Sequence, residues 1–462
     1  MTALAAAPSR ATAFDVAPAQ DRRLDALDVC LVVLYLLGLY LGVSLQITEK
    51  MPLTCAPSGF AGLILLWRRR DQIAPMHLAG LFVVVTIYLA SVLSASDITF
   101  LSKRFTGLVQ LVYSFVIAYA IFLTFASAER NQIAAILLIF CIVIIIGCLF
   151  ETYGGLRPLS DKVRAHLYDA GVVYDSDRRD EILYGRIRPK LFTSEPSAVT
   201  FAYTHYCAVW FTVTRSRWKY PIYFGLVALA LVVLPGPTLM LMLLLTIPYM
   251  MFLAGGSRRT SPTRLIGAAA ISGLVVLLVI VVGQSLFAAR LQELQSGKDA
   301  SFFYRFTGPM LVAFDMFRHH PWAGSGLTGE PYIANNVLDV YMNSASFQSA
   351  WRIPKIGDVL TNYFWLHWIY LGLVWGVVAL AGVSWWLRLL GAGSVLYCWA
   401  VWTILGQASG SYVGPKTWAV LMIAAACSRM IANSEERAPT SRTVPQPLIL
   451  QRLHPRTARA AA

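Results

Sequence analysis

Long runs of apolar residues, separated by short polar stretches, are the feature that most limits how this chain can fold. Runs of about 17–25 residues, the length that crosses the hydrocarbon core of a bilayer, recur along most of the sequence. Of all residues, 57% are hydrophobic and 13% are charged, whereas soluble domains carry about 25% charged residues. A segment in lipid must satisfy its own backbone hydrogen bonds, so these runs predict helices. We therefore expect an all-α polytopic membrane protein.

The apolar runs predict about twelve transmembrane helices within a membrane domain spanning 27–431. Pro52 and Pro57 interrupt the second run, and Pro235-Gly236-Pro237 predicts a tight turn between the seventh and eighth. The polar segment 1–26 is expected to be a retained cytoplasmic tail, and 432–462 a disordered one. The predicted ranges are 27–45, 51–67, 76–95, 105–127, 131–152, 196–214, 219–235, 236–254, 264–289, 359–388, 391–408 and 412–431.

Clusters of basic residues indicate the orientation of these helices. The positive-inside rule places them in the cytoplasm, and with the N-terminus inside they all fall on that side. Both termini are then cytoplasmic, in an inner membrane, and most of the net charge of +14 is explained by membrane topology. Binding of nucleic acid is not needed to explain it. The clusters are Arg68-Arg69-Arg70, Arg215/Arg217/Lys219 and Arg258/Arg259/Arg264.

The predicted helices carry few groups that suggest ion transport or metal binding. Cation-coupled transporters usually place carboxylates at mid-membrane, and no such pattern is found. His205 and His367 lie among aromatic residues, which favours a structural role over a catalytic one. The seven cysteines form no Cys-x-x-Cys pair, and most lie in or beside apolar runs. This favours buried thiols and predicts no metal site or disulfide framework.

Two outer segments, 153–195 and 290–358, are too long to be simple connections and are expected to carry the function. In the first, Arg186, Arg188 and Lys190 alternate, and Pro189 favours an extended chain before it. Alternate residues of an extended strand face one side. The cluster therefore suits a phosphate or diphosphate, or else lipid head groups.

A carboxylate ends the first of these segments. Glu195 precedes Pro196 at the predicted start of a helix. A negative charge is favoured there by the helix dipole, which gives Glu195 a structural interpretation. A general base facing the neighbouring cations is the alternative.

The second outer segment combines Arg305 with a predicted helix over 309–319. Pro309 suits the first turn of a helix. An apolar face at helical spacing predicts that this helix lies on the membrane or caps the bundle; its residues are Phe306, Met310, Phe314 and Phe317. His319-His320-Pro321 and then Gly324-Ser325-Gly326 follow, which predicts a stop and a flexible turn.

Three stretches together resemble the O-antigen polymerase and O-antigen ligase superfamily of integral membrane glycosyltransferases. Arg188 to Ser197 is similar to the family's Arg, Phe and Glu-Pro-Ser pattern. Arg305 to Gly326 is similar to an Arg, an amphipathic helix, His-Pro and Gly-x-Gly. The third stretch runs from Asn362-Tyr363 to Leu371-Gly372-Leu373 and Gly376. Thr361 stands where family ligases have His, so the resemblance is nearer to repeat-unit polymerases of the exopolysaccharide type.

The sequence also departs from the family pattern at two places. Leu191 stands where the family usually has a Gly after the first Arg, and Gly236-Pro237-Thr238 replaces a Ser-Arg-Thr/Ser element. These departures leave the class unchanged and affect the detailed alignment.

The resemblance implies a GT-C-like bundle whose two periplasmic loops contain short amphipathic helices. It implies transfer of a glycan from undecaprenyl diphosphate to an acceptor sugar hydroxyl, with inversion at C1 and without metal or cofactor. Cations would stabilise the departing diphosphate: Arg188 and Arg305, assisted by Arg186 and Lys190. Glu195 or Asp358 would orient or deprotonate the acceptor. His320, Asn362 and Tyr363 are expected to contact the substrate.

Partners and alternatives follow from the same resemblance. The expected partners are the lipid-linked oligosaccharide and the bilayer, with a chain-length regulator and a flippase as further candidates. An O-antigen ligase of the same superfamily is the first alternative function. A lipid-linked oligosaccharide flippase is the second, although flippases usually line an internal cavity with charge and have short loops.

Overall fold

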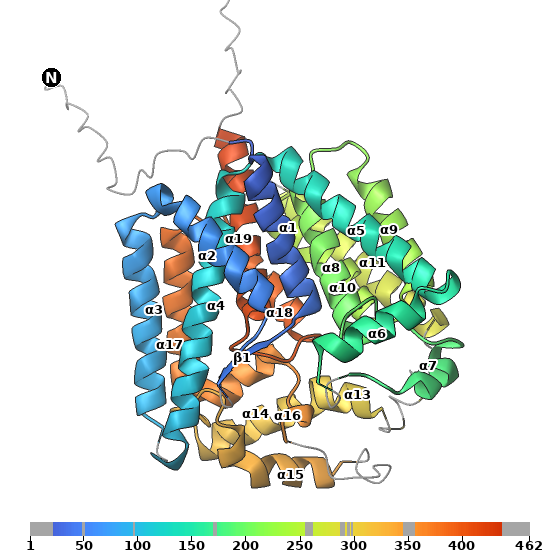
Figure 1. Cartoon of the computed structure of the whole chain (residues 1–462). Helices are drawn as coiled ribbons and strands as arrows, with labels where there is room; N and C mark the ends of the chain where they lie inside the picture. Colours follow the sequence, from blue (N-terminus) through green and yellow to red (C-terminus); the bar gives the residue numbers. More distant parts are fainter. Residues whose placement is uncertain are drawn as a thin grey trace, which may run out of the picture.

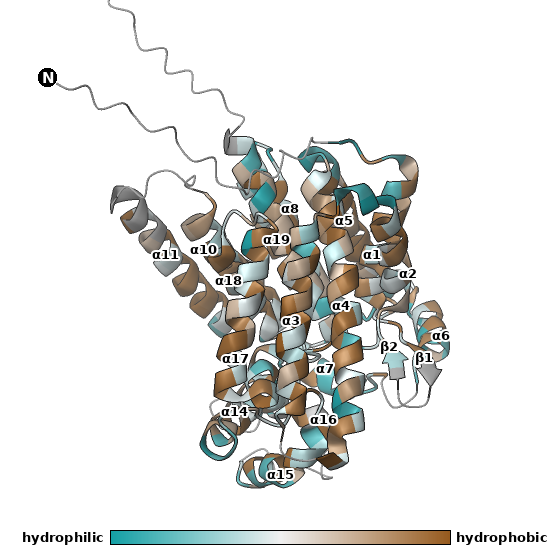
Figure 2. Ribbon diagram, turned by 90° about the vertical axis from the view of Figure 1, so that its left-hand side faces the viewer, coloured by the Kyte–Doolittle hydropathy of each residue, from teal (hydrophilic) through white to brown (hydrophobic). Residues whose placement is uncertain are grey.

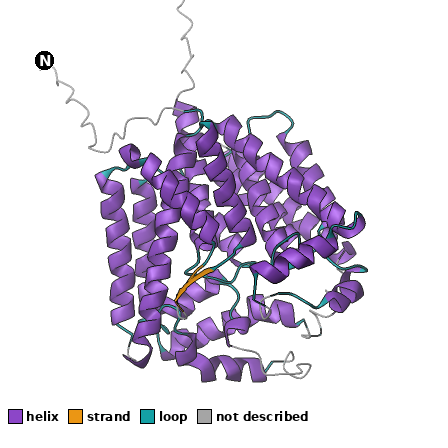
Figure 3. Cartoon of the chain, in the orientation of Figure 1, coloured by secondary structure: helices purple, strands orange, loops and turns teal. Residues whose placement is uncertain are grey.

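The computed structural model describes residues 22–48, 51–95, 98–169, 173–254, 262–286, 299–344 and 356–436, together with Gln292 and Ser296. Each of the twelve predicted ranges falls on a helix, and these helices run side by side as a bundle (Figure 1; Figure 3). They are α1 (Ala26–Leu41), α2 (Ala56–Arg68), α3 (Pro75–Leu93), α4 (Leu101–Ser127), α5 (Arg130–Tyr153), α8 (Pro196–Val213), α9 (Lys219–Val233), α10 (Met240–Phe252), α11 (Pro262–Leu286), α17 (Tyr363–Leu389), α18 (Val395–Gly406) and α19 (Pro415–Glu436).

Within the described residues, four helical stretches are long and apolar enough to cross a membrane: Pro75–Leu93, Ile98–Ser127, Arg130–Tyr153 and Tyr363–Leu389. Several of the other helices are apolar but shorter. Figure 2 shows apolar residues along the lengths of α3, α4 and α17. Exposed apolar side chains such as Phe82 suit a lipid environment. The class is therefore an all-α protein with membrane-spanning helices, and the number of crossings stays a prediction.

The outer ends of the first two predicted spans are wrong. α1 ends at Leu41, because Gly42 takes a left-handed conformation with φ of 70° and caps the helix. The chain then forms an antiparallel hairpin of β1 (Leu45–Thr48) and β2 (Met51–Leu53). α2 begins only at Ala56, where Pro57 suits the first helical turn.

The last helix is the centre of the bundle. α19 packs extensively on α4 and also contacts α18 and α8. Its small residues Ala424, Ala425 and Ala426 are buried and let neighbouring helices approach closely, while Trp418 is completely buried. This packing holds the first residues of α19 inside the protein, close to the outer segments.

The two outer segments lie at one end of the bundle, and α1 begins and α19 ends at the other (Figure 1). This is the arrangement that places both loops on one side of a membrane. The first segment holds α6 (Arg157–Leu167) and α7 (Asp177–Tyr184). The second holds α13 (Ala300–Phe302), the π-helical turn η4 (Phe303–Thr307), α14 (Gly308–His319), η5 (Glu330–Ile333), α15 (Ala334–Met342) and α16 (Ile356–Val359); further short turns are η1 (Arg70–Gln72), η2 (Ile98–Phe100) and η3 (Pro237–Leu239).

α14 agrees with the predicted helix over 309–319, and it caps the bundle by packing on α17. The ring of Phe314 lies 6.0 Å from that of Trp365, and the ring of Phe317 lies 5.9 Å from that of Trp368. The predicted apolar face is thus only partly covered by protein, since Phe314 is 48% exposed, and the buried side of α14 is formed by Val312, Ala313 and Met316.

The Gly324-Ser325-Gly326 turn packs against α17 at a break in that helix. The expectation of a flexible turn is therefore wrong. α17 breaks at Gly372, whose φ is 64°. The amides of Ser325 and Gly326 donate at 2.9 Å to the carbonyls of Ile369 and Tyr370 next to the break. A Cβ on Gly324 would lie 2.3 Å from the carbonyl oxygen of Ile369, so the close approach requires glycine.

Candidate functional site

Two adjoining cavities lie where the outer segments meet the bundle. One of about 480 Å³ has a long apolar wall, and we name it the amphipathic cavity. The other, of about 400 Å³, is lined about equally by polar and apolar surface; because it is the more polar of the two, we name it the polar cavity. They share a set of lining residues, which we name the junction: Arg179, Glu195, Ser197, Ser301, Arg305 and Ala408.

The amphipathic cavity is apolar on the side of α10 and α11. Met240, Leu241 and Leu244 of α10 and Val279 of α11 line that side, where α10 packs on α11. Its other end carries charged groups of both outer segments. A cavity of this kind fits a ligand with an anionic or polar head and an apolar chain, because the chain gains free energy on leaving water.

Among the described residues, the charged side chains that line the amphipathic cavity form arginine–carboxylate pairs, which balance one another. The guanidinium Nη2 to carboxylate distances are 2.8 Å for Arg188–Asp180, 3.4 Å for Arg179–Asp299 and 3.6 Å for Arg305–Glu195. The Arg305–Glu195 pair is the longest, and its side chains are 28% and 43% exposed. Arg305 is therefore the lining arginine best placed to exchange its carboxylate for an anionic ligand.

Arg305 is positioned by contacts from three elements. It lies in η4, and its carbonyl accepts a hydrogen bond of 2.7 Å from Nδ2 of Asn362. Its guanidinium donates to Oγ of Ser197 at 3.0 Å. The same Asn362 side chain caps α17 by accepting from the amides of Phe364 and Trp365. Asn362 therefore fixes the arginine through the backbone while being itself completely buried.

Glu195 lies at the start of α8, as predicted from Pro196. It is the N-cap residue with extended backbone, and its carbonyl accepts from Oγ1 of Thr193 at 2.9 Å. Its carboxylate lines both cavities. The arrangement brings Glu195, Ser197 and Arg305 of the two predicted motifs into one place.

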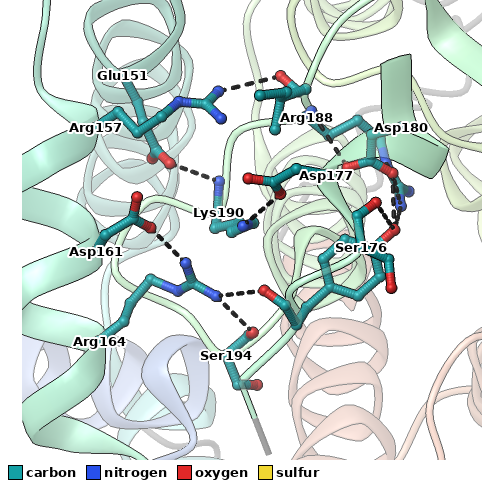
Figure 4. Close-up of polar contacts among 12 residues, drawn as sticks. Glu151, Arg157, Asp161, Arg164, Ser176, Asp177, Asp180, Arg188, Lys190 and Ser194 are labelled. Carbon is teal, nitrogen blue, oxygen red and sulfur yellow. Dashed lines mark hydrogen bonds and ion pairs between the residues drawn. The ribbon is translucent and has the colours of Figure 1, made fainter. Parts of the chain in front are cut away.

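Arg188 is held much more tightly than Arg305, and Figure 4 shows its pairing with Asp180. Its Nε donates to Asp180 Oδ1 at 2.9 Å, and its guanidinium lies 4.7 Å from the centre of the Tyr184 ring. The side chain is 13% exposed and that of Asp180 is 1% exposed. Burial is the largest single influence on Arg188 and opposes its charge, but the hydrogen bond and charge of Asp180 together with the neighbouring Tyr184 and Tyr174 raise the pKa of the guanidinium above its ordinary value.

The first outer segment is held together by buried charges that sequence reasoning missed. Arg164 of α6 donates to the carbonyls of Thr193 at 2.8 Å and Ser194 at 3.1 Å, and pairs with Asp161 (Figure 4). Glu151 at the end of α5 accepts from the amide of Lys190 at 3.0 Å. These groups fix the chain directly before Glu195.

The expectation that Arg186, Arg188 and Lys190 project to one side is wrong. Lys190 Nζ pairs with Asp177 at 2.7 Å in a separate hollow, and Arg186 donates to the hydroxyl of Tyr153 at 2.6 Å. The Glu151 and Asp180 carboxylates bind the backbone of this stretch, so the chain pairs with no neighbouring strand. It runs irregularly, and the alternation of a strand does not apply.

The other predicted site residues lie apart from the junction or outside the described side chains. Tyr363 is completely buried and donates to the carbonyl of Trp402 at 2.7 Å, which is a packing role. His320 ends α14, with its ring 5.4 Å from that of Tyr332. Burial, and next His319, lower the pKa of its imidazole. Asp358 belongs to α16, and its side chain lies outside the described part of the structure.

Sequence reasoning assigned no site role to several residues that line the cavities. Arg179 lines both, Gln407 lines the amphipathic cavity, and Lys416 of α19 lines the polar cavity. The Gly236-Pro237 turn also lines the amphipathic cavity. The position of Lys416 near the outer end of a predicted span was a usable signal, because charged groups in such helices are usually functional.

Comparison of the sequence with models of known protein families and with curated proteins finds no match. The resemblance described above thus rests on its three sequence stretches. The cavities at the junction are independent of it.

Proposed function

We propose that this protein is an inner-membrane glycosyltransferase that polymerises lipid-linked oligosaccharide repeat units of a bacterial exopolysaccharide or O-antigen. It crosses the membrane about twelve times, with both termini in the cytoplasm and both outer segments in the periplasm. It transfers a glycan from undecaprenyl diphosphate to an acceptor sugar hydroxyl.

The amphipathic cavity is the observation that carries the proposal. Its apolar wall on α10 and α11 suits the polyprenyl chain, and Arg305 at its charged end suits the diphosphate. Arginine binds phosphate oxygens through a planar fork of donors, and a developing negative charge strengthens that contact. On the outer face no nucleotide sugar is at hand, so the donor is a glycan already carried across on lipid.

The reaction is a displacement at C1 of the donor sugar. The acceptor oxygen forms a bond to C1 as the C1–oxygen bond to the diphosphate breaks, and the diphosphate leaves with the electron pair. Arg305 stabilises that charge more in the transition state than in the ground state. The acceptor proton passes to a base, for which Glu195 in the wall shared by both cavities is the first candidate. Asp358 remains the second candidate.

A ligase of the same superfamily is the nearest alternative. The position that family ligases fill with His is Thr361, whose Oγ1 donates to the carbonyl of Tyr304 at 3.1 Å. Thr361 lines the polar cavity but has no titratable side chain. This favours a polymerase. A flippase is disfavoured, because the charged groups that line the two cavities lie at one end of the bundle, where the outer segments meet it.

The test is polymerisation by the purified full-length protein in detergent, with repeat units on undecaprenyl diphosphate as the only glycan. We expect longer glycans and free undecaprenyl diphosphate, and we expect Arg305→Ala to lower the rate about 100- to 1,000-fold. Arg318→Ala is the matched control, since Arg318 is an exposed arginine of the same outer segment.

Three results would contradict the proposal. The first is a glycan that stays at one repeat unit with the wild-type protein, and the second is equal rates for Arg305→Ala and Arg318→Ala. A glycan that moves between vesicle leaflets without lengthening would favour the flippase.

A further inference from the structure

The two cavities differ in charge. In the amphipathic cavity each arginine faces a carboxylate. The polar cavity shares Arg179 and Arg305, which pair with Asp299 and Glu195, and adds Lys416; Glu195 is the one carboxylate among its described lining residues. Across the described residues, no carboxylate pairs with Lys416. Lys416 therefore gives the polar cavity an excess of one positive charge.

The position of Lys416 is unfavourable for its positive charge. It is the second residue of α19, where the positive end of the helix dipole disfavours a cation. Its ammonium passes close to Gly42: a Cβ there would lie 2.8 Å from Nζ of Lys416. The side chain is partly buried, so it is less fully hydrated than a surface lysine. An anion in the polar cavity would offset the unfavourable helix dipole and the reduced hydration of the ammonium group.

We infer that Lys416 binds an acidic group of the acceptor sugar, a carboxylate or a phosphate substituent, so that the enzyme builds an anionic polysaccharide. This rests on the function proposed above. The carrier chain lies along α10 and α11, which places its diphosphate at that cavity's charged end. Lys416 lines the polar cavity and is not among the residues that line the amphipathic cavity, so it lies apart from that wall. An anion at Lys416 is therefore attached to the glycan.

The positions of Lys416 and Glu195 would also orient the acceptor sugar. An acceptor whose acidic group is held by Lys416 presents its hydroxyl groups toward the junction, where Glu195 lies 3.6 Å from Arg305. A neutral acceptor lacks that anchor. Lys416 is thus a specificity-determining residue, whereas Arg305 faces both cavities and serves the donor.

The experiment measures binding of three probes to the full-length protein in detergent. The probes are a disaccharide ending in glucuronic acid, its neutral glucose counterpart and farnesyl diphosphate as a short carrier analogue. We expect the acidic disaccharide to bind about tenfold more tightly than the neutral one. Lys416→Gln should abolish that preference and leave farnesyl diphosphate binding unchanged, and Lys416→Arg should keep it.

The outcomes separate this inference from the proposed function. Equal binding of the two disaccharides, or a preference that persists in Lys416→Gln, overturns the acidic acceptor. If Lys416→Gln weakens the binding of farnesyl diphosphate, the anion at Lys416 belongs to the carrier. That result also overturns the acidic acceptor. Loss of farnesyl diphosphate binding in Arg305→Ala supports the carrier site that both proposals need. Unchanged farnesyl diphosphate binding in Arg305→Ala counts against the function proposed above, whatever the disaccharides do. An unchanged unfolding temperature shows that each variant is folded.

Discussion

Arg188 and Arg305, one from each outer segment, come from motifs that suggested the same role, yet their surroundings differ. Arg188 is closed in by a buried carboxylate and two tyrosine rings. Arg305 is more exposed and holds its carboxylate at 3.6 Å. A buried pair resists rearrangement, because each ion depends on the other for the solvation lost on burial. The comparison indicates that Arg188 holds the first segment in shape and that Arg305 contacts the ligand.

The largest expected effect separates these two roles. Arg188→Ala leaves the buried carboxylate of Asp180 without its cation, which should destabilise the fold by about 3–5 kcal/mol. We expect a lower unfolding temperature in detergent and less protein in the membrane. The double variant Arg188→Met/Asp180→Leu removes both charges and should recover most of that stability.

Stable Arg188→Ala protein without activity would break the comparison. It would return Arg188 to the contact role that its motif suggested. Arg305→Ala serves as the reference, since its loss should affect the rate and leave the unfolding temperature near that of the wild type.

An intermediate effect is expected from the residue that positions Arg305. Asn362→Ser keeps a side chain that caps helices well but removes the amide that donates to the carbonyl of Arg305. Small displacements of a catalytic group are costly, so the polymerisation rate should fall about 10- to 100-fold with little change in unfolding temperature. Asn362→Ala should lose about 1 kcal/mol of stability as well, through the missing cap.

Equal rates for Asn362→Ser and the wild type would show that η4 holds Arg305 without this hydrogen bond. A fall in stability for Asn362→Ser as large as that for Asn362→Ala would show that the serine does not cap α17.

The smallest effect is expected at the remaining pair of the amphipathic cavity. Arg179 is 41% exposed, so its pairing with Asp299 is screened by solvent. The Asp299 carboxylate also accepts from the amides of Ser301 and Phe302, which keeps it satisfied without the arginine. Arg179→Gln should change the unfolding free energy by about 0.2–1 kcal/mol, and less at high salt. A loss as large as that of Arg188→Ala would show that this contact between the two outer segments is structural.

Hydrophobic periodicity and breakers predicted the helical ranges, because a helix in lipid must be long and apolar. The basic clusters predicted that both long segments share one side, and both lie at one end of the bundle. Glu195 and Arg305 were also recognised from local sequence. The ends of α1 and α2 were not, since the hairpin between them depends on backbone pairing that hydropathy does not report.

The sequence by itself predicted the helices that are apolar enough to span a membrane, their order, and the two long segments that lie at one end of the bundle. Only the tertiary structure decided which cations share a cavity, because charge pairs are set by contacts between distant residues. The tertiary structure pairs Arg188 with Asp180 and pairs Lys190 with Asp177 in a separate hollow. It also places Lys416 of α19 in the polar cavity, beside the junction. The tertiary structure also packs the backbone at Gly324 against the break of α17 at Gly372. This contact depends on two distant segments, so neither segment's sequence predicts it alone.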